Sequence, residues 1–225
     1  FFSPENNPAH EFYHDFLEMY FGCQCTPNEY VLRPDEDLYS DMLDLFSKHI
    51  FYVYPKDLSP TPDYIKERFL ELYIKEKIDG CVIDPFNQLA NNYNGVGGRT
   101  DKYLETLLSD FSRFSQANQL YMVIVAHPKM MHKDGTGNYP CPDVFDVADG
   151  AMWNNKMDNI LIYHRVNHQT DPAHPGCQFH TKKIRRQKSV GKKGMVEFEY
   201  NRMKRRYIFE NVDPLQDQVD RLANG

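Results

Sequence analysis

The sequence lacks any apolar run close to the roughly 20 residues that a membrane-spanning helix needs, so no membrane association is expected. It has one tryptophan and no internal repeat or low-complexity linker. We find no secretory signal peptide, which makes the cytoplasm the default compartment. Nothing resembles a nucleophile triad or a dinucleotide fingerprint, so a small-molecule enzyme is disfavoured. These absences favour a globular protein built around one core.

Cysteine is also scarce and irregularly placed. The five cysteines are an odd number, and Cys23 and Cys25 form a lone C-x-C with no second pair nearby. A zinc site needs four ligands in tetrahedral arrangement and stays an open alternative. Reduced thiols are the expected state, with Cys81 in the core because it falls within an apolar run.

What the chain does have is enough apolar material for one large domain. It contains 225 residues, of which 41% are hydrophobic and 14% aromatic. That length can bury a sizeable core. The first residues, Phe1-Phe2-Ser3, are typical of the end of a strand, so we expect an excised piece of a longer protein.

Charge is distributed unevenly along the chain. The net charge is −6, which does not by itself indicate a nucleic-acid-binding protein. The first fifty residues are strongly acidic, whereas residues 176–207 are strongly basic. Such asymmetry permits a phosphate or nucleic-acid partner at the basic end. A solvated basic hairpin explains the same pattern equally well.

Hydrophobic periodicity predicts alternating helices and strands. We expect helices over 10–21, 38–46, 61–74 and 101–118, and strands over 50–54, 78–84 and 120–126. This alternation predicts an α/β fold with a doubly wound, mostly parallel sheet flanked by helices. Period-two segments follow and predict an antiparallel C-terminal β extension over 159–166, 178–185, 195–200 and 206–209.

Two of the predicted strands end in polar residues. The apolar run 78–83 ends in Asp84, and the run 120–126 ends in His127. Ligands of open α/β sheets bind at the carboxyl edge, so both side chains are expected at one site. A carboxylate in this position commonly holds Mg²⁺ for a bound nucleotide.

Five stretches in order carry a resemblance to a known family. They are Phe2-Ser3-Pro4-Glu5-Asn6, Val82-Ile83-Asp84-Pro85, Val123-Ile124-Val125-Ala126-His127-Pro128, the segment 148–165, and Lys183-Ile184-Arg185 with the glycine-bearing strand 194–201. From the first residues to about Tyr207, the chain resembles the C-terminal RecA-like ATPase domain of hexameric replicative DNA helicases of the DnaB/Twinkle type. This group includes phage primase-helicases and their prophage relatives.

The resemblance implies ATP, or another nucleoside triphosphate, and Mg²⁺ as cofactors. Glu5 would polarise the attacking water, and Asp84 would hold Mg²⁺ through a bound water. His127 would sense the γ-phosphate, since an imidazole can donate to a phosphate oxygen with one nitrogen and relay with the other.

Further residues are implied to act between subunits or on DNA. Lys183 and Arg185 would project into the ATP site of a neighbouring subunit, where a guanidinium stabilises charge on the transferring phosphoryl group. The loop 128–142, with Lys129 and Lys133, would line a channel and contact the DNA backbone. Asn155 stands where the family has a Gln that links DNA and subunit contacts.

The main departure from the family is a missing motif. No G-x-x-x-x-G-K-[ST] phosphate-binding loop occurs in the chain, and the glycine-rich stretch 95–100 lacks the lysine and follows Asp84. In the family this Walker A loop precedes the first of the five stretches. We therefore expect a domain truncated after that loop.

The expected organisation is an ATPase domain over 1–210 and a polar tail over 211–225. The resemblance implies a bacterial, phage or prophage helicase that forms a homo-oligomer, a hexameric ring, moves on single-stranded DNA, and has a fused or separate primase. Two alternatives stay open. One is another RecA-like ATPase, a recombinase or signalling oligomer, and the other is a non-catalytic DNA-binding or assembly module.

Overall fold

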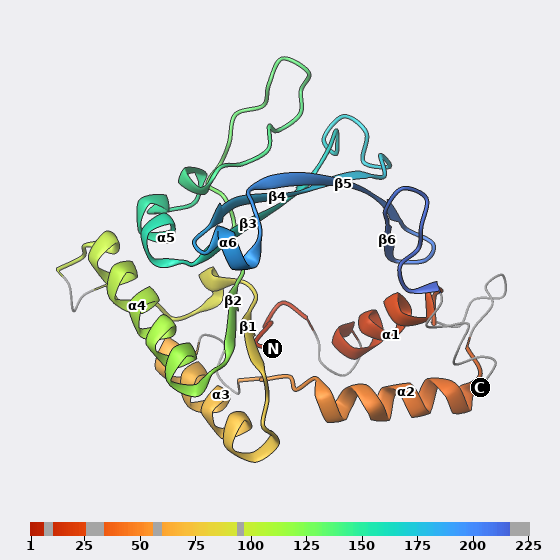
Figure 1. Cartoon of the computed structure of the whole chain (residues 1–225), viewed down its shortest axis with the longest axis horizontal. Helices are drawn as coiled ribbons and strands as arrows, with labels where there is room; N and C mark the ends of the chain where they lie inside the picture. Colours follow the sequence, from red (N-terminus) through yellow and green to blue (C-terminus); the bar gives the residue numbers. More distant parts are fainter. Residues whose placement is uncertain (7–10, 26–33, 56–59, 94–96, 217–225) are drawn as a thin grey trace.

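A computed structural model describes residues 1–6, 11–25, 34–55, 60–93 and 97–216 (Figure 1). Gly95 and Val96 of the glycine-rich stretch therefore lie outside the described residues. The elements are α1 (Tyr13–Phe21), α2 (Glu36–His49), α3 (Pro62–Glu76), β1 (Gly80–Ile83), η2 (Phe86–Gln88), α4 (Thr100–Asn118), β2 (Tyr121–Ile124), η4 (Val144–Asp146), α5 (Gly150–Lys156), β3 (Asn159–Arg165), β4 (Gly176–Ile184), α6 (Gln187–Val190), β5 (Gly194–Asn201) and β6 (Arg206–Ile208).

The parallel sheet contains the first residues of the chain. β1 pairs in parallel with β2, and Phe2 forms a parallel bridge with Ile83 on the other side of β1. The terminal amine of Phe1 donates to the carbonyl of Phe51 at 2.7 Å, and Val53 N–H donates to the carbonyl of Phe1 at 2.7 Å. The spatial order is therefore 51–53, 1–3, β1, β2. The predicted strand 50–54 is not assigned as a strand, but its backbone continues the parallel pattern.

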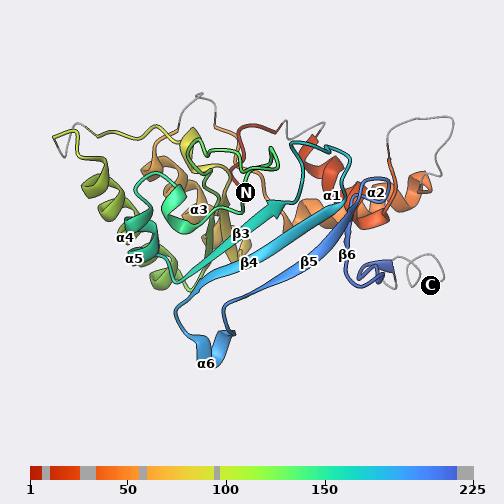
Figure 2. The same ribbon diagram turned by 90° about the horizontal axis from the view of Figure 1, so that it is seen from above.

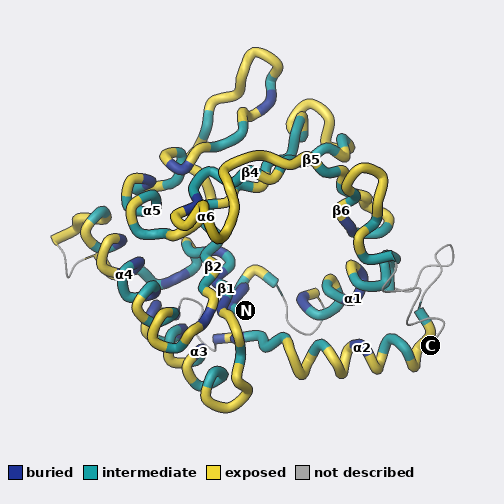
Figure 3. The backbone as a smooth tube through the Cα atoms, viewed as in Figure 1, coloured by how far each residue is buried: buried dark blue, intermediate teal, exposed yellow. Residues whose placement is uncertain are grey.

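The main core lies between this sheet and helices α3 and α4. The buried colour in Figure 3 concentrates where these elements meet. Cys81 is in this core, as expected, and is 1% exposed. Burying each large apolar side chain contributes about 1.5–3 kcal/mol. The members of this core include Phe2, Val53, Ile65, Phe69, Ile83, Leu107, Phe111 and Leu120.

Helix α4 also contributes to a second, smaller core with η4 and α5. Leu104 and Leu108 of α4 pack there with Val144 and Trp153. The Trp153 ring is edge-on to Phe86 with centroids 5.2 Å apart, and its indole N–H donates to the carbonyl of Ala148 at 3.1 Å. The single tryptophan is thus a packing residue, as predicted. It fixes α5 beside the segment that follows Asp84.

The C-terminal strands are antiparallel, as predicted, and form a sheet of their own in the order β3-β4-β5-β6 (Figure 2). Within the described residues, no ladder hydrogen bond joins this sheet to β1 and β2. Figure 1 shows the antiparallel sheet arching from α5 toward α1. Among the described residues, no helix has the length and apolar character required to cross a bilayer.

A buried arginine joins the far end of this arch to α1. Arg206 of β6 is 2% exposed, and its guanidinium donates to the carbonyls of Met19, at 2.7 Å, and Tyr20. It also donates to Asp213 at 2.9 Å. Gly22 ends α1 with φ 67°, and a Cβ there would lie 2.7 Å from the Arg206 Cζ. The helix end and the guanidinium therefore fit only with glycine at this position.

The neighbouring Arg205 neutralises a second buried carboxylate. Glu18 is 1% exposed, and its carboxylate lies 2.7 Å from Arg205 Nε and 3.0 Å from His14 Nε2. It also accepts from Cys25 N–H at 2.9 Å. A buried carboxylate is strongly disfavoured without such partners, so α1 depends on β6. Asp213 belongs to the predicted tail, whose described part, 211–216, thus contacts β6. The domain limit at residue 210 stays a prediction.

We predict that Arg206→Ala lowers the free energy of unfolding by about 3–5 kcal/mol, because it leaves Asp213 and two helix carbonyls buried without their partner. Urea denaturation followed by circular dichroism measures the loss. Arg186→Ala is the control, since Arg186 is exposed, and it should change stability by less than about 0.5 kcal/mol. Equal stabilities for the two variants would contradict the role of Arg206.

Candidate functional site

Three of the predicted site residues lie along one edge of the parallel sheet. Glu5 follows the strand segment 1–3, Asp84 follows β1, and His127 follows β2. The alignment is fixed by the backbone, because Asp84 N–H donates to the carbonyl of Phe2 at 2.9 Å and Val125 N–H donates to that of Ile83 at 2.9 Å. Neighbouring strands are about 4.8 Å apart. The three side chains therefore begin from adjacent strand ends.

The electrostatics of Asp84 show that the three groups interact. Burial raises the pKa of the half-buried Asp84, the charge of Glu5 raises it further, and His127 opposes the shift. Two carboxylates in electrostatic contact favour a bound cation. Among the described residues, no group of three or more His, Cys, Asp or Glu side chains is arranged to hold a metal ion. The pair fits Mg²⁺, which is usually held by one or two carboxylates together with substrate phosphates.

Two residues that sequence reasoning missed hold Glu5 and its turn. The side-chain amide of Gln88 donates to the Glu5 carboxylate at 2.9 Å. The Tyr52 hydroxyl donates to the carbonyls of Asn6, at 2.7 Å, and Ser3. Burial raises the pKa of Tyr52 to about 12, so the hydroxyl stays a donor. Neither residue belongs to a sequence motif, and no signal in the chain could have linked them to Glu5.

Lys183 and Arg185 lie apart from this cluster. Lys183 of β4 donates to the carbonyl of Asn154 in α5, and burial lowers its pKa, with a smaller contribution from Arg185. Arg185 pairs with Asp158, and its N–H donates to the Asp158 carbonyl at 2.9 Å. No contact in the described part of the chain joins either residue to Asp84. An exposed ion pair of this kind contributes at most about 1 kcal/mol, so another anion can replace Asp158.

The predicted DNA-contacting residues are exposed. Lys129 follows His127 closely, and its N–H donates to the carbonyl of Asp146 at 2.6 Å, which anchors the start of the loop 128–142. The Lys133 ammonium lies 5.6 Å from the centroid of the Tyr139 ring. Asn155 is exposed on α5. The two lysines are thus carried by one loop that begins at the site edge.

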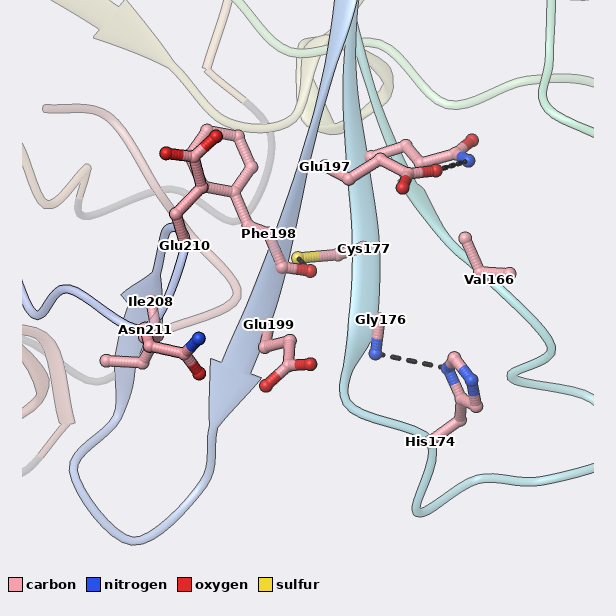
Figure 4. A pocket seen from close by; sticks show the side chains of 11 residues that line it. Val166, His174, Gly176, Cys177, Glu197, Phe198, Glu199, Ile208, Glu210 and Asn211 are labelled. Atoms are coloured by element: carbon pink, nitrogen blue, oxygen red, sulfur yellow. Dashed lines mark hydrogen bonds between the residues drawn. The ribbon is translucent and has the colours of Figure 1, made fainter.

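A cavity of about 310 Å³ lies elsewhere, between β4, β5 and β6 (Figure 4). Its lining includes Glu197, Glu199 and Glu210. His174 also contributes, with Nδ1 accepting from Gly176 N–H at 3.1 Å. Three carboxylates repel a phosphate group, so this cavity does not suit a nucleotide phosphate. The edge formed by Glu5, Asp84 and His127 remains the candidate site.

Comparison with known proteins gives one sequence relative and clear structural neighbours. No protein-family model matches the chain. The Twinkle homolog protein, chloroplastic/mitochondrial, of Arabidopsis thaliana is 31% identical over 159 residues, which is 70% of this chain and 22% of that protein. The chain therefore spans about a fifth of that relative.

Two solved structures match in fold. One, an isolated ATPase domain, has a TM-score of 0.62 at 12% identity, and the match covers 92% of this chain and 72% of that one. The other, a DnaB-like replicative helicase whose structure was solved with its interactions with primase, has a TM-score of 0.63 at 13% identity, covering 92% and 50%. At these identities the matches establish the fold.

Fold and strand-end residues define the class as a RecA-like α/β domain, which confirms the predicted fold. The sequence relative narrows this class. The chain is a RecA-like domain of the DnaB/Twinkle helicase type, as its five sequence stretches predicted.

We predict that Glu5→Gln lowers the raised pKa of Asp84, since one negative neighbour is removed, and that His127→Ala raises it further. Carboxyl-detected NMR titration of Asp84 measures both shifts. Glu67→Gln, an exposed position on α3, is the control and should leave Asp84 unchanged. Shifts of the same sign in both variants would show that the three groups do not form one electrostatic cluster.

Proposed function

We propose that the protein is the motor part of a ring-forming DNA helicase, which hydrolyses a nucleoside triphosphate, ATP being expected, and moves along single-stranded DNA. The observation that carries the proposal is the alignment of Glu5, Asp84 and His127 at the carboxyl edge of the parallel sheet, where ligands of such sheets bind. The sequence relative is named for Twinkle, and the structural neighbours are an ATPase domain and a DnaB-like replicative helicase.

Each residue at the edge has a chemical task in this proposal. Glu5 would accept a hydrogen bond from the attacking water, and Gln88 fixes the orientation of its carboxylate. Asp84 would hold Mg²⁺ through water, and the ion would neutralise phosphate charge. His127 would donate to the γ-phosphate. The 225 residues contain no G-x-x-x-x-G-K-[ST], so the proposal assigns the phosphate-binding loop to another part of the protein.

Oligomer formation completes the site in this proposal. Arg185 would exchange its exposed pair with Asp158 for the phosphate of a neighbouring subunit, with Lys183 beside it. An arginine suits the task because its planar fork matches phosphate oxygens. A hexameric ring is the proposed assembly, and a primase, fused or separate, is a proposed partner, by analogy with the DnaB-like helicase. The cytoplasm of a bacterial, phage-infected or prophage-bearing cell stays a prediction from the sequence.

Single-stranded DNA would bind along the loop 128–142. Lys129 and Lys133 are exposed and lie within six residues of His127, so bound phosphates would be close to the nucleotide edge. Asn155 would contribute a polar contact from α5. Backbone contacts of this kind are sequence-tolerant and sensitive to salt.

We predict that Arg185→Ala in the full-length protein lowers the rate of hydrolysis by about a thousandfold, because a phosphate-contacting guanidinium is lost. Asp84→Asn should be similarly inactive. Mixing the two inactive variants should restore part of the activity, since an Asp84→Asn subunit still supplies Arg185 to its neighbour. Steady-state phosphate release measures both effects.

Arg113→Ala is the matched control, because Arg113 is also an exposed arginine paired with a carboxylate, Asp110. It should hydrolyse at the normal rate. An active Arg185→Ala variant, or mixtures that stay inactive, would count against an arginine that acts between subunits.

We predict that Lys129→Ala and Lys133→Ala each weaken binding of single-stranded oligonucleotides of any sequence, and each reduce the slope of log affinity against log salt by about 0.7. Fluorescence anisotropy at several salt concentrations measures the slope. Lys75→Ala, on the exposed side of α3, is the control and should leave it unchanged. An unaltered slope in the loop variants would move DNA binding away from this loop.

A further inference from the structure

The loop 128–142 contains one residue that the proposed DNA contacts do not use. Asn138 is 7% exposed, whereas most of the surrounding loop is exposed, as the tube in Figure 3 shows. A buried side-chain amide is disfavoured unless its donors and acceptor are satisfied. The partners of Asn138 therefore indicate what this loop is attached to.

Three hydrogen bonds of Asn138 reach the connection between β3 and β4. Its Oδ1 accepts from Thr170 N–H at 3.1 Å and from Thr170 Oγ1 at 3.0 Å. Its Nδ2 donates to Asn167 Oδ1 at 3.4 Å, and to Thr136 Oγ1 within the loop at 3.2 Å. We name the bonds to Thr170 and Asn167 the Asn138 contact. Both ends of the amide are occupied.

The tip of the loop is itself well ordered by hydrogen bonds. The Asp134 carboxylate accepts from the N–H groups of Thr136, at 2.8 Å, and Asn138, at 3.2 Å. Asp134 N–H donates to the Asn138 carbonyl at 2.8 Å. Gly137 has φ 83°, and a Cβ added there would lie 3.4 Å from Thr170. The tip therefore contacts the connection as a preformed turn.

The connection is in turn tied to the antiparallel sheet. Val166 N–H donates to the carbonyl of Gly176, where β4 begins, at 3.1 Å. Arg165 of β3 lies 3.3 Å from His168 Nε2. At its other end β4 contains Lys183 and leads into Arg185. One covalent strand thus runs from the segment that binds Asn138 to the residues proposed to act on a neighbouring subunit.

We propose that Asn138 is a positioning residue, which couples the loop 128–142 to β4 so that DNA bound by the loop alters the placement of Lys183 and Arg185. The inference rests on the proposed function, because it takes single-stranded DNA as the ligand of the loop. A loop that moved alone would leave the amide of Asn138 and the N–H of Thr170 without partners. The loop and the connection consequently move together.

The first test compares hydrolysis by the full-length protein with and without a single-stranded thymidine oligonucleotide. Asn138→Ala should leave the rate without DNA within about twofold of normal, and should reduce stimulation by DNA about tenfold. Thr170→Val removes one of the three hydrogen bonds and should give an intermediate loss. Asn118→Ala is the matched control, because its amide also bonds a carbonyl, that of Phe114, but at the far end of α4.

A second measurement does not require the proposed function. Brief trypsin digestion, followed by mass spectrometry, reports cleavage after Lys129 and Lys133. Asn138→Ala should accelerate this cleavage about tenfold over the normal protein, since the loop loses its attachment, whereas Asn118→Ala should not.

The outcomes separate the two ideas. Unchanged cleavage in Asn138→Ala overturns the positioning role, and so does accelerated cleavage with full stimulation by DNA. If the normal protein is not stimulated by DNA at all, the proposed function fails, and accelerated cleavage then supports attachment of the loop alone.

Discussion

Backbone hydrogen bonds on both sides of the segment 1–3 hold it inside the parallel sheet. Phe1 bonds to Phe51 and Val53 on one side, and Phe2 bonds to Val82 and Asp84 on the other. These bonds bring Glu5 to the strand end beside Asp84. The core depends on the same placement, because Phe2 is fully buried between the sheet and its helices. One constraint thus sets both the packing and the candidate site.

Charged residues of this domain fall into two physical regimes. Arg206 is buried, and its partners are two helix carbonyls and Asp213, so exchanging them would leave several groups unsatisfied. Arg185 is exposed and shares Asp158 with solvent, so exchange is easy. Arginines only 21 positions apart in sequence therefore have opposite uses. The first fixes the arch of the antiparallel sheet onto α1, and the second is available to meet another molecule.

Local patterns predicted most of the elements and the edge of the site. The apolar runs that end in Asp84 and His127 are strands, and the helical spacing of 101–118 is α4. The separate antiparallel sheet was not predicted, because strand pairing between distant segments leaves no local pattern. The same holds for Gln88, which is 83 residues from Glu5. The basic stretch 176–207 was read as one feature, yet Lys204, Arg205 and Arg206 are used in internal ion pairs.

The order of the parallel segments also has a consequence for folding kinetics. Phe1 pairs with a segment 50 residues later, and Phe2 pairs with Val82 across a still longer stretch of chain. Each pairing closes a long loop before any neighbouring strand can support it. High contact order of this kind slows folding relative to helical domains of similar size. The strand that contributes Glu5 leaves the ribosome well before β1, but it can enter the sheet only after β1 has emerged.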